Sequence, residues 1–78
     1  MSLVFYGVDE INKVDVTEVA VAKCMENQTL IIPIGDPQRA EIFGDPYVGK
    51  YKSIFIVELN GSIFVFDHMT HVYIEHFQ

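Results

Sequence analysis

The sequence predicts a single α+β domain over residues 1–78, with the element order β-α-β-(short α)-β-β-β and a mainly antiparallel sheet. Seventy-eight residues leave room for only one hydrophobic core. Asn60 and Gly61 separate two apolar runs, which is typical of a tight β-hairpin. Asp15 and Glu18 have the spacing of a capping box ahead of a stretch with apolar residues at helical intervals. We therefore expect one long helix packed on a face of the sheet.

The first element is a strand, because the run "LVFYGV" at residues 3–8 is made of strand-forming residues and ends near a polar segment. A helix from Val16 to about Glu26 should follow, with Asn27 as a left-handed terminal residue. Its buried stripe would hold Val16, Val19, Ala20 and Cys24. The valines of this segment also favour a strand, so residues 14–26 remain open to both interpretations.

The next stretch predicts a strand and then a short helix. The run "TLIIPI" at residues 29–34 is almost entirely apolar, as expected of a strand covered on both faces. In the segment that follows, Asp36 suits the N-cap, Pro37 the first helical position and Gly44 the residue after the last turn. A second Gly-Asp-Pro, at residues 44–46, should instead form a turn that leads into the hairpin.

The C-terminal half predicts a three-stranded meander. A two-residue type I′ turn at Asn60 and Gly61 would pair Val57 with Phe64 and Phe55 with Phe66. "DHMT" would form a second turn, and "HVYIEHF" the last strand. Both faces of the hairpin are apolar, and the helix can cover only one of them. We therefore expect a homodimer, with Ile54, Ile56, Ile63 and Val65 as interface candidates; which face is core and which is interface stays open.

The charge of the chain excludes several partners. Eleven acidic residues against five Lys and Arg give a net charge of −6, which disfavours nucleic acid and anionic membranes. The sequence has no apolar run long enough to span a bilayer, and its start does not predict a signal peptide, so we expect a cytoplasmic location. The single cysteine, Cys24, is expected to be a buried small hydrophobe. No cofactor is predicted.

Two groups of residues are candidates for binding. Asp36, Arg39, Asp45 and Tyr47 could hold a small polar ligand such as a sugar or a peptide, because they combine charges with an aromatic ring in a loop-rich stretch. Asp67, His68 and His71 carry the groups that transition metals prefer, but their spacing matches no established zinc signature. For both groups, ordinary turn and capping chemistry is the favoured interpretation.

These observations favour a small binding or assembly module that associates with itself through an apolar sheet face. A protein or small polar ligand could occupy the Asp-rich loop. The alternatives are a small enzyme that uses Asp36, Arg39 and Asp45 with a histidine, and a metal-binding protein that uses Asp67, His68 and His71. The sequence alone favours a protein that is not an enzyme.

Overall fold

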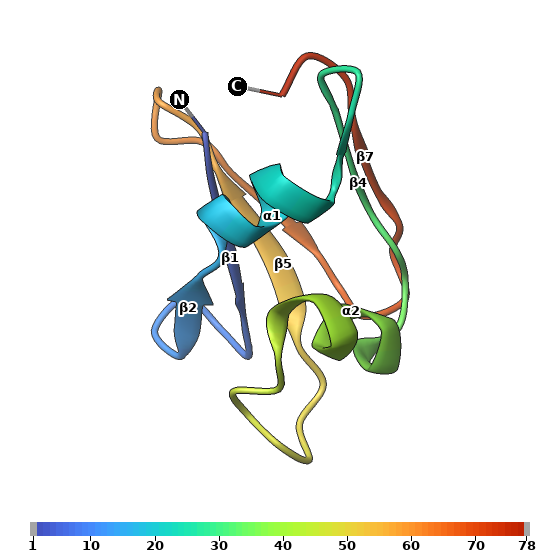
Figure 1. Ribbon diagram of the computed structural model, residues 1–78. Helices are drawn as coiled ribbons and strands as arrows, with labels where there is room; N and C mark the ends of the chain where they lie inside the picture. The colour runs from blue at the N-terminus through green and yellow to red at the C-terminus, as the bar shows by residue number, and fades with distance from the viewer. Residues whose placement is uncertain (1, 78) are drawn as a thin grey trace.

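The computed structural model describes residues 2–77, which form seven strands and two helices (Figure 1). The elements in chain order are β1 (Leu3–Gly7), β2 (Lys13–Asp15), α1 (Thr17–Lys23), β3 (Met25–Glu26), β4 (Thr29–Ile32), α2 (Asp36–Phe43), β5 (Ser53–Val57), β6 (Ile63–Phe66) and β7 (Val72–Ile74). Neither helix in this part of the chain is long and apolar enough to cross a membrane.

The strands form two antiparallel sheets. Sheet A has the strand order β2-β1-β5-β6, and sheet B has the order β3-β4-β7. The predicted α+β class with mainly antiparallel strands is therefore confirmed, whereas the predicted element order lacks β2 and β3. The expected long helix is not found, because α1 has only seven residues, whereas the expected short helix forms as α2 with eight.

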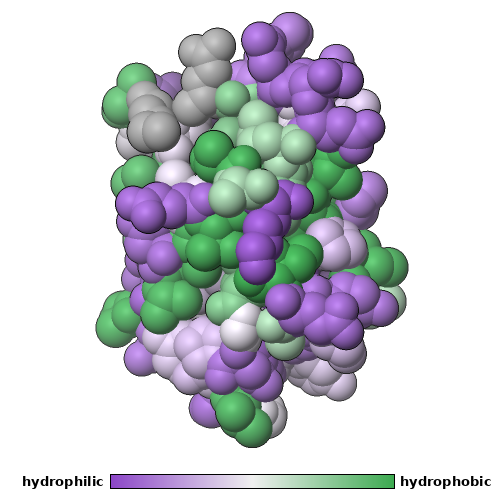
Figure 2. Space-filling model, viewed as in Figure 1, coloured by the Kyte–Doolittle hydropathy of each residue, from purple (hydrophilic) through white to green (hydrophobic). Residues whose placement is uncertain are grey.

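The core lies between one face of sheet A, the two helices and sheet B. Figure 1 shows α1 crossing in front of β1 and β5, with β4 and β7 to one side. The buried cluster includes Val4, Tyr6, Ile54 and Ile56 from sheet A, Val16, Ala20 and Cys24 from the α1 segment, and Leu30, Ile32 and Val72 from sheet B. Three of the four residues predicted for the buried stripe, all except Val19, belong to this cluster. Figure 2 shows the α1 side, where hydrophobic residues across the middle are interrupted by hydrophilic ones.

The helix α1 is shorter than predicted because the chain turns back into a hairpin. Asp15 does act near the helix start, where its carboxylate accepts a hydrogen bond from the backbone N–H of Thr17 at 2.9 Å. The helix ends at Lys23, and Met25–Glu26 then pairs with β4. Asn27 and Gln28 have φ values of 51° and 70°, as the two central residues of a type I′ turn require. Part of the alternative prediction is thus correct, because strands flank a helix within this segment.

The hairpin of β5 and β6 is confirmed, but its register differs from the prediction by one residue. The backbone N–H of Glu58 donates to the Ser62 carbonyl at 2.9 Å, and the N–H of Gly61 donates to the Glu58 carbonyl at 2.9 Å. Only Gly61 of the turn has a positive φ, at 90°, so the loop has three residues and ends in a left-handed glycine. Ile56 consequently pairs with Phe64, and Ile54 with Phe66.

A register shift of one residue puts each side chain of β6 on the same face as the β5 side chains that the prediction placed on the opposite face. Ile54 and Ile56 lie on the inner face with Phe64 and Phe66, not on the face of Ile63 and Val65 as predicted. The inner face of sheet A consists of Val4, Tyr6, Ile54, Ile56, Phe64 and Phe66. The outer face of sheet A consists of Leu3, Phe5, Phe55, Val57, Ile63 and Val65.

The predicted meander is also wrong, because β7 leaves the sheet of β5 and β6. The "DHMT" turn forms as expected, with the Thr70 N–H donating to the Asp67 carbonyl at 3.1 Å. After this turn β7 pairs with β4 in sheet B, where Ile74 lies opposite Leu30 and Val72 opposite Ile32. Strands β6 and β7 therefore form the edges of two different sheets.

Candidate functional site

The start of α2 places the first predicted ligand residue. Gly35, with φ 93°, takes the N-cap position, so Asp36 is the first helical residue and not the cap itself. Pro37 follows within the first turn, and the Gly44 N–H closes the helix by donating to the Ala40 carbonyl at 2.8 Å. The Asp36 carboxylate makes no capping bond. It accepts a hydrogen bond from the backbone N–H of Lys52, at 3.2 Å for Oδ2 and 3.4 Å for Oδ1.

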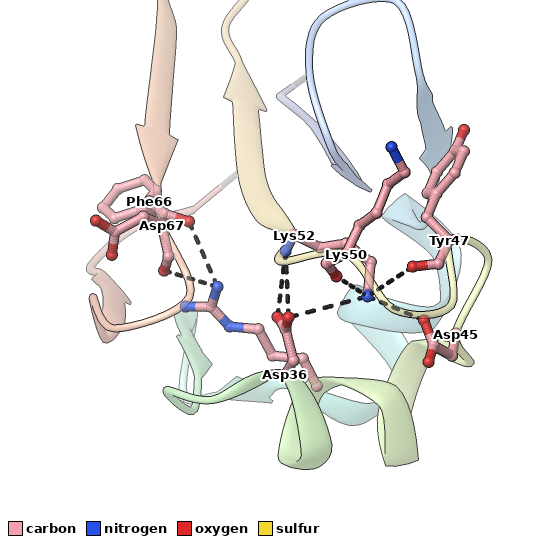
Figure 3. Close-up of polar contacts among 8 residues, drawn as sticks. Asp36, Asp45, Tyr47, Lys50, Lys52, Phe66 and Asp67 are labelled. Atoms are coloured by element: carbon pink, nitrogen blue, oxygen red, sulfur yellow. Dashed lines mark hydrogen bonds and ion pairs between the residues drawn. The ribbon is translucent and has the colours of Figure 1, made fainter.

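A buried ammonium group connects α2 with the loop that follows it. Lys52 is 3% exposed, and its Nζ lies 3.0 Å from Asp45 Oδ1 and 3.9 Å from Asp36 Oδ2. The same Nζ donates to the carbonyls of Tyr47 at 3.1 Å and Lys50 at 2.5 Å. Figure 3 shows these contacts converging on Nζ, with the ring of Tyr47 directed away. We call Asp36, Asp45, Tyr47, Lys50 and Lys52 the Lys52 cluster.

A cavity of about 450 Å³ lies beside the Lys52 cluster. Its lining residues are Asp36, Pro37, Ala40, Asp45, Gly49, Lys50, Tyr51 and Lys52. Both carboxylates already face the Lys52 ammonium, which in turn has three close oxygen partners. Within residues 2–77, neither Arg39 nor a histidine lines this cavity. The cluster thus holds the 44–52 loop in place, and its charged groups neutralise one another instead of forming an acid–base pair.

Arg39 lies apart from the other predicted ligand residues and is fully buried. Its guanidinium donates from Nε to the Pro33 carbonyl at 2.8 Å, from Nη1 to the Asp67 carbonyl at 2.8 Å and from Nη2 to the Thr70 carbonyl at 2.5 Å. A longer contact of 3.4 Å reaches the Phe66 carbonyl. Burial lowers the pKa of Arg39, while nearby Tyr6, Asp36 and Asp67 oppose that change. This side chain connects the β4–α2 junction to the β6–β7 turn.

Tyr6 brings a phenol near the same charges. The side chain is fully buried, its ring lies 5.4 Å from that of Phe43, and its hydroxyl has no hydrogen-bond partner among residues 2–77. Burial, reinforced by the negative charges of Asp36 and Asp45, raises the pKa of Tyr6 to about 12. The phenol is therefore neutral at physiological pH and cannot act as a base there.

The proposed metal ligands serve a turn. Asp67 Oδ1 accepts from the Met69 N–H at 2.9 Å and from the Thr70 hydroxyl at 2.8 Å, and these bonds lower the pKa of Asp67. The His68 ring stacks on Tyr51 at 4.2 Å, and its carbonyl accepts from the Gly35 N–H at 2.7 Å. His71 is exposed. In the part of the chain that the structure describes, no three His, Cys, Asp or Glu side chains are grouped closely enough to hold a metal ion.

The outer face of sheet A is the other candidate site. Both helices and sheet B pack against the inner face of sheet A. The outer face, on the opposite side of the sheet, also carries apolar side chains. Ile63 and Val65 are 46% and 56% exposed and Leu3 is 37% exposed, whereas Phe55 is only 4% exposed and Phe5 and Val57 are partly buried. The neighbouring strand β2 supplies the charged residues next to this face, and the Lys13 ammonium lies 5.0 Å from the Phe5 ring centroid.

Comparison with known proteins gives no match: no family model, no curated protein and no solved structure resembles the chain. The site must therefore be interpreted from its own residues. Of the four predicted ligand residues, the carboxylates of Asp36 and Asp45 and the carbonyl of Tyr47 meet around Lys52, whereas the Tyr47 ring points away and Arg39 lies apart. Nothing in the sequence indicated that Lys52 belongs to this site, because lysine is rarely buried. In the structure two backbone carbonyls accept hydrogen bonds from its ammonium group.

Proposed function

We propose that this protein is a small assembly module that forms a homodimer by packing the outer faces of two copies of sheet A against each other. The observation that carries the proposal is the outer face itself, on which six apolar residues of β1, β5 and β6 lie together. The exposed part of this face, at Leu3, Ile63 and Val65, favours an interaction surface, because apolar area is costly to leave in water. A second copy supplies the same surface through an isologous contact.

Charge also favours a second copy over an unrelated acidic or basic partner. On the outer side of sheet A, strands β1, β5 and β6 carry no charged side chain, and β2 adds one cation and one anion, Lys13 and Asp15. Two net charges of −6 repel one another elsewhere on the surface, and salt screens this repulsion. Association should therefore strengthen as ionic strength rises, which is the opposite of an interface based on ion pairs.

The size of the face sets the expected affinity. Strands β1, β5 and β6, about 4.8 Å apart and rising about 3.4 Å per residue over four or five residues, present roughly 230 Å² of projected area. Stable interfaces bury about 800 Å² per partner, so this contact is at the low end unless flanking loops contribute. We therefore expect a dissociation constant in the micromolar range.

Sedimentation equilibrium from about 5 μM to 1 mM tests the proposal. The wild-type chain of 8.9 kDa should approach twice that mass at the upper concentrations. Val65→Glu places a carboxylate on the outer face and should remain monomeric. Val48→Glu is the matched control, because Val48 is 80% exposed in the 44–52 loop, and it should dimerise like wild type. A wild-type monomer at 1 mM would overturn the proposal, as would a Val65→Glu variant that still dimerises.

A further inference from the structure

A second apolar surface lies on the opposite side of β6, where the two sheets separate. A groove of about 290 Å³ opens between β6 and β7. It is lined by Ser2, Ile56, Glu58, Phe64, Phe66, Ile74, Glu75, His76 and Phe77. We propose that this groove binds an extended peptide that carries a large apolar side chain between basic residues. This inference does not depend on the homodimer, because the groove lies on the inner side of sheet A.

The floor of the groove suits one large apolar side chain. Ile56, Phe64 and Phe66 contribute from sheet A, and Phe64 remains 49% exposed although it lies on the inner face. Ile74 and Phe77 close the other side. A cavity of about 150 Å³ holds a benzene ring, so about 290 Å³ is sufficient for an aromatic or branched aliphatic side chain.

The edge of β6 can hold the backbone of such a peptide. The hydrogen bond between Glu58 and Ser62 fixes the ladder, so alternation directs the N–H and C=O groups of Phe64 and Phe66 toward β5. The corresponding groups of Ile63 and Val65 then point away from β5. No strand within residues 2–77 pairs with this edge, since β6 is the last strand of sheet A. An added strand would place alternate side chains beside Phe64, over the groove.

The charge at the rim selects basic flanking residues. Glu58 and Glu75 both line the groove, and the ion pairs within residues 2–77 involve only Lys52. His76 is the remaining titratable group of the lining. With a net charge of −6 for the whole chain, the site repels acidic peptides and attracts Lys or Arg.

Binding of a labelled probe tests this inference. The probe is an acetylated, fluorescein-labelled peptide of sequence Lys-Thr-Phe-Thr-Lys, which as a strand puts its Phe and both Lys on one side. Fluorescence anisotropy should give saturable binding below 1 mM, and the same peptide with Glu in place of both Lys should bind at least tenfold more weakly. In the protein, Phe64→Ala and Glu58→Lys should each weaken binding at least tenfold.

Matched variants separate this site from general electrostatics and from the dimer. Glu41→Lys makes the same charge change on α2, away from the groove, and should alter binding by less than twofold. Leu3→Glu, which places a carboxylate on the outer face at β1 and leaves the edge of β6 unchanged, should still bind the probe as a monomer. Absence of binding at 1 mM would overturn the inference. Equal weakening of probe binding by Glu58→Lys and Glu41→Lys would also overturn it.

Discussion

The buried guanidinium of Arg39 gives the sharpest prediction about stability. Arg39→Met keeps an unbranched apolar side chain in the same space but removes the bonds to the carbonyls of Pro33, Asp67 and Thr70. Each hydrogen bond from a charged donor contributes about 1.5–3 kcal/mol. The three carbonyls are partly buried, so water replaces some of this loss, and we expect a total cost of about 3–4 kcal/mol. A domain of this length has about 4–12 kcal/mol of stability, so much of the margin is lost.

Urea unfolding followed by circular dichroism measures this cost. All variants are compared at one protein concentration, because self-association would add to the apparent stability. Lys23→Met is the control, since it removes the same charge from an exposed site in the last turn of α1, and it should change the unfolding free energy by less than about 0.5 kcal/mol.

A second variant separates charge from geometry. Arg39→Lys keeps the cation but replaces the planar fork with a single ammonium, so its stability should lie between those of wild type and Arg39→Met. An Arg39→Met protein within 1 kcal/mol of wild type would refute the role that we assign to this side chain.

The other predictions concern three positions. Lys52→Met should speed tryptic cleavage after Lys50 several-fold, because it releases the 44–52 loop, and an unchanged rate relative to Lys23→Met would contradict this. Tyr6→Phe should leave the unfolding free energy equal or raise it by up to about 1 kcal/mol. The pKa of Tyr6 is raised from 10.0 to about 12 in the folded protein. The free energy of unfolding of the wild type should therefore be unaffected by Tyr6 ionisation below pH 10 and should fall as the pH rises from 10 to 12. Urea unfolding over this pH range should show a smaller fall for Tyr6→Phe. Gly61→Ala should cost about 1 kcal/mol by thermal melting, more than Asn60→Ala, because only Gly61 has a positive φ.

Local chemistry was sufficient to predict several elements. The segments of β1, β4 and α2 are each bounded by glycine, proline or a turn, so their limits are written in neighbouring residues. The β5–β6 hairpin was predicted for the same reason. Its register was not, because Asn60 and Gly61 fit two turns: both central positions of a type I′ turn, or the last two residues of a three-residue loop. Burial of Ile54 and Ile56 in the core accompanies the second choice.

The burial of the two cations, Arg39 and Lys52, was not predicted. Arg39 bonds to carbonyls that lie 27 to 31 positions away, in a turn whose location depends on how the sheets are assembled. Lysine and arginine are also usually exposed, so residue type argues against burial. The grouping of Asp36 with Asp45 was anticipated because both lie close to α2, but the Lys52 that holds them together was missed.

A dilution series followed by methyl and amide NMR tests the central claim, that the outer face of sheet A is a self-association surface. Between about 1 mM and 20 μM, the resonances of Leu3, Ile63 and Val65 should shift together along one two-state curve, while those of Val48 in the 44–52 loop stay constant. Spectra that do not change over this range, or changes confined to residues outside the outer face, would contradict the account.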